Sequence, residues 1–473
     1  MNRAIVRLFG VVVVLFALLV VWSTRWTVVD ATSLNNNSLN VRPLLAELRV
    51  KGGRILADDG TVLAKPVPGP GGTWQRAYPT GSLFAQAVGY QIAAQGRSAG
   101  LERSHANQIR GDQTGIGSIF GQLNPNPVGN DVYTTLDPNA QRAAQQALAG
   151  QNGSVVALDP RTGGMLVMYA NPSYDDNNPD AGGPNVSTFN RTTQGGYAPG
   201  STFKIVTATA AIDGGKYTPN SLINGNSPLL VSGVPLNNDG NQSWGPQTLT
   251  TAMTYSINTI FAQVAETVGR ATMTEYMKRF GFYAKPLLDY PPNELSISRP
   301  FSPAGRPYPP GSPNEDIGRI GIGQGGLEVT PLQMAMVAAA VANGGKLMTP
   351  HLATRIVNPE GVTVQTIAST AQSQVMSSTS AQQVTQMMEN VVEEGTGTTV
   401  QIPGLTIAGK TGTASIGSTG SNLTQPSFVA FAPAQDPKVA IAVMVDRSQG
   451  GFGATVAAPI ARAVLQTLLA EGR

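Results

Sequence analysis

The chain has 473 residues, of which 12% are charged, and its formal charge at pH 7 is +3. This length predicts two or three domains with a large buried core, and so small a charge, without a run of Lys and Arg, excludes nucleic-acid binding. The absence of cysteine excludes disulfides, a cysteine nucleophile and thiolate metal sites, and we expect neither a metal nor a cofactor.

The N-terminus predicts a membrane anchor over residues 4–24. Arg3 and Arg7 precede an uncharged run of Val and Leu, and the apolar stretch approaches the roughly 20 residues that cross a bilayer. Trp22 and Trp26 suit the membrane interface. The alternative is a cleaved signal peptide, but only a weak small-residue cleavage site follows. We therefore expect an uncleaved single-pass anchor with a cytoplasmic N-terminus and the remaining chain outside the cytoplasm.

Residues 25–150 are predicted to form a small mixed module. An Asn- and Ser-rich polar stem over 27–45 comes first. The expected elements are a hairpin over 54–64 around Asp59-Gly60, a strand over 131–136 and a helix over 138–148 capped by Asp137.

A second composition begins near residue 153, so we expect a larger domain over 151–473. It contains strands at both ends and helices between them, which predicts an α+β domain whose sheet is assembled from distant segments. The expected strands are 154–158, 165–169, 406–414, 427–432 and 439–445, and the expected helices are 201–212, 249–268, 331–342 and 457–470.

Ser201-Thr202-Phe203-Lys204 is the only S-x-x-K in the chain. On a helix, residues three apart share a face, so the lysine amine comes within reach of the serine hydroxyl. A partly desolvated lysine can take the proton of that hydroxyl without help from histidine, and neither His105 nor His351 lies in a recognisable catalytic setting. Pro199-Gly200 lets Ser201 open the helix, where its free N–H can face a developing oxyanion. An incidental pair on a surface helix is the alternative, but the apolar residues that follow indicate burial.

Ser256-Ile257-Asn258 is an S-x-N element in apolar, helical sequence. A hydroxyl and an amide at this place can relay a proton to a leaving amine and hold the backbone of a substrate. The motif alone is weak, because Ser33, Ser38 and Ser312 also begin S-x-N triplets. A turn at a helix boundary is the structural alternative.

Lys410-Thr411-Gly412-Thr413 is the only K-[ST]-G in the chain and lies in strand-like sequence. Gly412 leaves room where a substrate backbone would pair with the strand edge. Lys410 and the two threonine hydroxyls can donate to a carboxylate, and the Thr413 N–H can complete an oxyanion hole.

The three motifs occur in the order typical of penicillin-binding proteins and β-lactamases. Further stretches make the chain resemble class B penicillin-binding proteins, the single-pass D,D-transpeptidases of peptidoglycan synthesis, most closely those of the actinobacterial PbpA type. The similar stretches are 155–163, 197–204, 321–324, 327–333 and 394–398, with looser matches at Arg54, 58–60 and 100–102. The resemblance implies a β-lactamase-like transpeptidase fold, a mainly antiparallel sheet flanked by helices, over 151–473. It also implies a pedestal or dimerisation-like module over 25–150.

The resemblance implies a complete set of site residues. The implied catalytic residues are Ser201, Lys204, Ser256, Asn258 and Lys410, and the implied substrate-binding residues are Thr411, Gly412 and Thr413. In this reading Ser201 is acylated by a peptidoglycan stem peptide ending in D-Ala-D-Ala, Lys204 is the general base, and an acceptor amine resolves the acyl-enzyme. β-Lactams acylate the same serine. A membrane glycan polymerase of the FtsW/RodA type is the implied partner.

Other activities remain to be weighed against this one. A β-lactamase needs a deacylating Glu, and Glu294 follows the S-x-N element at a suitable distance. However, Ser298 stands where the pattern E-x-x-x-N requires Asn. The pedestal and anchor argue against a D,D-carboxypeptidase, and the intact motifs argue against a non-catalytic cell-wall scaffold.

Overall fold

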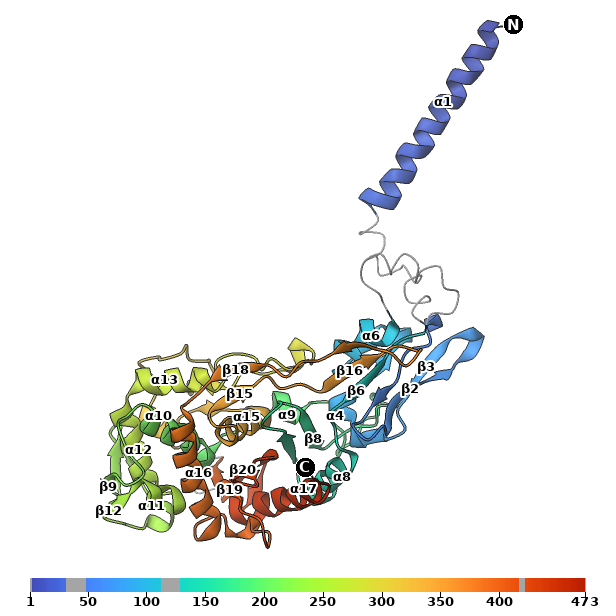
Figure 1. Cartoon of the computed structure of the whole chain (residues 1–473). Helices are drawn as coiled ribbons and strands as arrows, with labels where there is room; N and C mark the ends of the chain where they lie inside the picture. The colour runs from blue at the N-terminus through green and yellow to red at the C-terminus, as the bar shows by residue number, and fades with distance from the viewer. Residues whose placement is uncertain (1, 31–47, 112–127, 417–421, 473) are drawn as a thin grey trace.

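The computed structural model describes residues 2–30, 48–111, 128–416 and 422–472 (Figure 1). Helix α1 (Asn2–Thr24) continues into a π-helical turn (Arg25–Val29), and its side chains are exposed. The stretch Arg3–Val29 is long and apolar enough to cross a membrane, which agrees with the predicted anchor. The predicted polar stem lies mostly outside the described residues.

The larger part of the molecule is built on an antiparallel sheet. Its strands are β7 (Gly153–Leu158), β8 (Met165–Asn171), β19 (Ala408–Ser415), β20 (Leu423–Ala432) and β21 (Val439–Val445). Their order is β19-β20-β21-β7-β8, so segments nearly 300 residues apart lie side by side. The prediction of a mainly antiparallel sheet assembled from distant segments is confirmed.

Helices cover both faces of this sheet, so β7, β8 and β21 are buried at nearly every position rather than at alternate ones. Along β7, Val155 and Ala157 pack into one core cluster with α8 (Pro138–Ala147) and α17 (Ala458–Ala470). Val156 and Leu158 point to the other face and join the cluster that contains α15 (Pro331–Ala342). This alternation is the period-2 geometry of a strand buried on both sides.

The predicted helix over 249–268 is wrong in its middle. The structure has two helices, α11 (Leu249–Thr254) and α12 (Asn258–Val268), separated by a turn in which Ser256 has φ 60°. This left-handed conformation costs a non-glycine residue about 1–2 kcal/mol. The residues at the break, Tyr255-Ser256-Ile257-Asn258, form the helix-boundary turn that was the structural alternative for this motif. The S-x-N motif therefore sits on a bend between two helices.

The smaller module contains a second sheet, of order β17-β16-β6-β1-β2-β3. Four strands come from the N-terminal part: β1 (Ile55–Leu56), β2 (Val62–Pro68), β3 (Trp74–Ala77) and β6 (Asp131–Thr134). The pairing of β1 with β2 confirms the predicted hairpin. The other two strands, β16 (Ala353–Val357) and β17 (Thr363–Thr366), come from about three quarters of the way along the chain, and Figure 1 shows orange β16 beside cyan β6. The boundary near residue 150 stays a prediction.

Two acidic side chains of the larger part, Asp289 and Glu294, contact the smaller module. The Asp289 carboxylate accepts hydrogen bonds from the backbone N–H of Leu352 (2.7 Å) and Ala353 (2.9 Å) and lies 3.2 Å from His105 Nε2. Glu294 accepts from the backbone N–H of Gly100 at 3.2 Å.

Candidate active site

Ser201 lies in a short 3₁₀ turn (Gly200–Phe203) that leads directly into α10 (Lys204–Asp213). Gly200 has φ 53°, and its backbone N–H donates to the carbonyl of Gly323 at 3.0 Å. The Thr202 hydroxyl donates to the carbonyl of Pro199 at 2.8 Å and so stabilises the turn. The predicted helix start at Ser201 is therefore a tighter turn, with the α-helix beginning three residues later.

Lys204 is fully buried, and its amine lies against the S-x-N turn. The Nζ atom is 2.7 Å from the Ser256 carbonyl oxygen, 2.7 Å from Asn258 Oδ1 and 3.2 Å from Ser256 Oγ. Burial lowers the pKa of Lys204 well below its usual value, and the charge of Lys410 lowers it further, whereas Asp239 acts in the opposite direction. The structure thus brings Lys204, Ser256 and Asn258 together around an amine that readily loses its charge.

Strand β19 carries the K-T-G motif past the turn that contains Ser201 (Gly200–Phe203), which we call the nucleophile turn. Lys410 is fully buried, its amine donates to the Thr411 carbonyl at 3.1 Å, and burial lowers its pKa to about 7. The Thr413 hydroxyl accepts from the backbone N–H of Gly453 at 3.1 Å. Both hydroxyl-bearing residues of the motif are therefore held by neighbouring segments, since Thr411 Oγ1 also lies 2.6 Å from Thr396 Oγ1.

Two glycines allow β19 to approach the nucleophile turn closely. A Cβ on Gly412 would lie 2.3 Å from Ser427 Oγ and 2.6 Å from the Pro199 carbonyl oxygen. A Cβ on Gly200 would lie 3.1 to 3.2 Å from the backbone of Thr413. Both distances are shorter than ordinary contacts, so only glycine permits this approach. The backbone of Ser201 and that of Thr413 consequently lie next to each other, as a shared oxyanion site requires.

Sequence comparison identifies the family of this fold. Residues 153–466 match the family described as penicillin binding protein transpeptidase domain, and residues 52–120 match the penicillin binding protein A dimerisation domain. The chain belongs to the penicillin-binding protein transpeptidases.

Individual penicillin-binding proteins are similar over the whole chain. The peptidoglycan D,D-transpeptidase PbpA of Mycolicibacterium smegmatis is 33% identical, with all of both chains covered. The solved structure of penicillin-binding protein A from M. tuberculosis in its ceftriaxone acyl-enzyme complex superposes with a TM-score of 0.79 at 30% identity, covering 90% of this chain and 100% of that one. Its penicillin G acyl-enzyme complex gives 0.76 at 30% identity, covering 89% and 99%.

Several residues around this penicillin-binding protein site were missed by sequence reasoning. Thr396 and Gly323 lie in stretches that resemble the family, but their contacts with Thr411 and Gly200 have no local signature. Ser427, whose hydroxyl donates to the Pro199 carbonyl at 3.1 Å, lies in an ordinary strand sequence. The segment Asn237-Asn238-Asp239 also went unnoticed, because only the folded chain brings it to the S-x-N turn.

Glu294 does not belong to the hydrogen-bonded groups around Lys204. Its carboxylate binds the backbone of Gly100 in the smaller module, and burial raises its pKa. Ser298, which replaces the Asn of the lactamase pattern, donates no amide and instead accepts from the backbone N–H of Thr330 at 3.0 Å. The glutamate considered as the deacylating residue of a β-lactamase therefore joins the two parts of the molecule.

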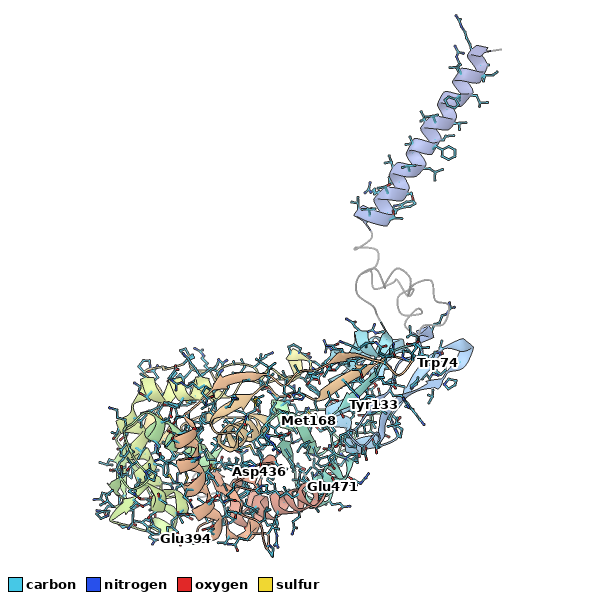
Figure 2. The ribbon with its side chains drawn as sticks, in the orientation of Figure 1. Trp74, Tyr133, Met168, Glu394, Asp436 and Glu471 are labelled. Carbon is cyan, nitrogen blue, oxygen red and sulfur yellow. The ribbon has the colours of Figure 1, made fainter. Side chains whose placement is uncertain are left out.

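In Figure 2 the part of the molecule outside the N-terminal helix is elongated, and two labelled residues mark its ends. Trp74 marks the end formed by the smaller module, and Glu394, at the end of α16 (Ser378–Glu393), marks the opposite end.

Proposed function

We propose that this protein is a peptidoglycan D,D-transpeptidase that works through an acyl-enzyme on Ser201. The observation that carries the proposal is the fully buried Lys204 amine, held on the S-x-N turn one helical turn from the serine. Membership of the transpeptidase family and the full-length similarity to PbpA support the same reaction.

In the first half-reaction, Ser201 Oγ attacks the carbonyl carbon of the penultimate D-alanine. The neutral Lys204 amine takes the hydroxyl proton as the C–O bond forms. The peptide C–N bond then breaks, and the proton passes to the leaving amine of the terminal D-alanine, with Ser256 Oγ, 3.2 Å from Nζ, as the relay. The backbone N–H groups of Ser201 and Thr413 stabilise the charge on the oxyanion.

The terminal carboxylate of the substrate binds along β19. Lys410 has a pKa of about 7, so near neutrality it is only partly charged in the free enzyme. A bound carboxylate favours its protonated form and so completes the charge pair. Thr411 and Thr413 add hydroxyl donors, and the absence of a side chain at Gly412 lets β19 hold these donors close to the turn that carries Ser201.

In the second half-reaction, the amine of a neighbouring stem peptide attacks the acyl carbon. Lys204 removes a proton from this amine, and Ser201 is released with its hydroxyl restored. β-Lactams acylate the same serine, but their ring-opened acyl group stays in place of the D-alanine that would normally leave.

Replacement of the nucleophile tests the assignment. Ser201→Ala is expected to abolish covalent labelling of the full chain by a fluorescent penicillin, whereas Ser378→Ala, an exposed serine at the start of α16, is expected to label like the wild type. Intact mass spectrometry should find one β-lactam adduct per wild-type chain and none on Ser201→Ala. Persistent labelling of Ser201→Ala would move the nucleophile elsewhere.

The fate of the acyl-enzyme separates the alternatives. A transpeptidase transfers the acyl group of a D-Ala-D-Ala stem peptide to an added amine, and its penicillin adduct survives for minutes or longer. Release of the free acid as the main product with the amine present would favour a D,D-carboxypeptidase. Rapid turnover of penicillin would favour a β-lactamase, and a chain without adduct or transfer would be a scaffold.

We also propose that the N-terminus is cytoplasmic, that the catalytic domain lies outside the cytoplasm and that an FtsW/RodA-type polymerase is the partner. Because the chain has no cysteine, a single Ser378→Cys variant has no background reactivity with thiol reagents. Labelling of this variant in intact cells by a membrane-impermeant maleimide is expected. Labelling only after lysis would reverse the topology, and failure of the polymerase to copurify would remove the partner.

A further inference from the structure

The side chain of Asn258 is held from two sides. Its Oδ1 lies 2.7 Å from Lys204 Nζ, and its Nδ2 donates to the carbonyl oxygen of Asn237 at 3.3 Å. A carbonyl can only accept, so the Asn237 carbonyl requires the NH₂ end of the amide on its side. The oxygen end is thereby directed at the lysine.

Asn238, the next residue, fixes the position of that carbonyl. It is 4% exposed, and its Oδ1 accepts from the backbone N–H of Thr259 at 2.9 Å, in the first turn of α12. Its Nδ2 donates to the carbonyls of Gly225 and Gln242, both at 2.9 Å. One buried amide thus joins the loop that carries Asn237 to the helix that carries Asn258, with both of its N–H groups and its oxygen in use.

The orientation of the Asn258 amide matters for the chemistry of Lys204. A neutral amine has two N–H groups and one lone pair. The two shortest contacts of Nζ, to the Ser256 carbonyl and to Asn258 Oδ1, are both with acceptors and take both N–H groups. The third contact, to Ser256 Oγ at 3.2 Å, is with a hydroxyl, so the lone pair is left to a hydroxyl proton and not to an amide N–H. With the amide reversed, the NH₂ group of Asn258 would donate to the lone pair and compete with the serine.

We infer that Asn238 is a positioning residue that, through the Asn237 carbonyl, fixes the amide orientation of Asn258 and keeps the Lys204 lone pair free for the serine hydroxyl. This inference rests on the proposed function of Lys204 as the base. It assigns to a loop outside the three motifs a defined part in acylation.

The charged groups that act on Lys204 define the expected pH dependence. Lys410 lowers its pKa and Asp239 raises it, and the Phe261 ring lies 5.4 Å from Nζ. Oδ1 of Asn258 stabilises the ammonium form as an acceptor. Loss of this acceptor therefore lowers the pKa of Lys204 further, so the acid limb of the acylation profile moves to lower pH while the plateau falls.

The test compares Asn238→Ala with Gln263→Ala in the full chain. Gln263 is the matched control, because its Nε2 donates to the Asn224 carbonyl at 2.8 Å and ties the same helix to the same region, one turn beyond Thr259. The second-order rate of acylation by fluorescent penicillin is measured from about pH 5 to about pH 10. We expect Asn238→Ala to be slower by roughly tenfold or more, with its acid limb at lower pH, and Gln263→Ala to follow the wild type.

Asn238→Ser is the second variant, in case Asn238→Ala does not fold. It adds no charge and keeps a small polar group in the buried loop, so it should fall between wild type and Asn238→Ala in rate. A slower rate with an unmoved acid limb, or equal slowing by Gln263→Ala, would overturn the inference. Ser201→Ala in parallel separates the two hypotheses, because failure of the proposed function leaves that variant labelled, whereas failure of this inference does not.

Discussion

Two fully buried lysines, Lys204 and Lys410, define this site at the level of single side chains. Lysine is almost never buried without a paired charge, because desolvation of the ammonium is costly. Neither amine is paired with a carboxylate among the described residues, and burial lowers both pKa values. A buried lysine whose pKa is lowered can act as a base, and one that is partly neutral can also gain a charge when an anion binds.

Lys410 should therefore destabilise the protein in a pH-dependent way. Its pKa is about 7 in the folded chain against 10.5 for an ordinary lysine, a difference on the order of 5 kcal/mol. Below about pH 7 this cost is fully present, because the folded protein must hold a buried ammonium. It fades towards pH 10.5, where the unfolded chain also loses the proton.

We expect Lys410→Met to melt at a higher temperature than the wild type at pH 7, with a difference that shrinks as the pH approaches 10. Penicillin acylation should be strongly reduced in the same variant, because the carboxylate loses its charged partner. Thermal melting of the full chain in detergent measures the first effect and gel fluorescence the second. A pH-independent difference in melting temperature would contradict the assigned pKa.

Asp239 offers a second electrostatic test on the exposed side of the site. Its carboxylate raises the pKa of Lys204, so Asp239→Asn should lower that pKa and move the acid limb of penicillin acylation to lower pH. The shift should shrink in high salt, since exposed charges are screened. An acid limb that moves to higher pH in Asp239→Asn would show that a group other than Lys204 titrates there.

Among the elements, the nucleophile turn depends on a contact between two glycine-containing segments. Gly323 has φ 76°, and a Cβ there would lie 1.9 Å from the Gly200 carbonyl oxygen. Gly60 has φ 86° with no atom within 4 Å of a Cβ. Alanine at either position would carry the backbone strain of a positive φ, about 1–2 kcal/mol. The two positions differ only in whether the added Cβ meets another atom.

Gly323→Ala should therefore lower the melting temperature more than Gly60→Ala and reduce penicillin acylation at least tenfold by displacing Ser201. Gly60→Ala should retain acylation. Melting curves and labelling rates of the two variants measured side by side provide the test. Equal effects of the two substitutions would mean that the 321–324 segment does not hold the turn.

The sequence predicted those elements whose boundaries are set locally. Asp137 caps α8 by accepting from the backbone N–H of Asn139 and Ala140, and alternating turn and apolar signals predicted β7 and β8 within one or two residues. The break at Ser256 was expected only as an alternative, because its positive φ is compensated by tertiary contacts, including the Lys204 amine on its carbonyl. The structure brings the three motifs together, but the Asn237–Asn238 support was not predicted, since it depends on a loop 21 residues away in sequence.

The whole molecule consists of two parts whose joint is polar. The Asp289 carboxylate contacts the N–H groups of Leu352 and Ala353 and the His105 ring at this joint. Asp289→Ala leaves the two N–H groups without their acceptor, and each lowers the free energy of unfolding by about 1–3 kcal/mol where water does not reach it. Asp180, in a surface pair with Arg97, is the matched control, because exposed pairs contribute little.

We expect Asp289→Ala to lower the melting temperature and to expose the joint to limited proteolysis, while Asp180→Ala behaves as the wild type. Penicillin acylation should persist in both, since neither carboxylate belongs to the site. Loss of acylation without loss of stability in Asp289→Ala would show that the smaller module controls the site directly.

Domain organisation was the part least accessible to the sequence. The strand patterns of β16 and β17 gave no indication of their partner, because pairing with β6 joins residues more than 200 apart. Long-range pairing is decided by the packing of the finished molecule and leaves no periodic signal in either segment.

The shared sheet also sets an order of events during synthesis. β1, β2, β3 and β6 leave the ribosome first, yet their sheet lacks its last two strands until Thr366 has emerged, when roughly three quarters of the 473 residues have been made. Until then the free edge of β6 is an open template for pairing with other chains. The first part of this protein to be translated is thus among the last to be completed, and a nascent chain interrupted before that point exposes an aggregation-prone edge.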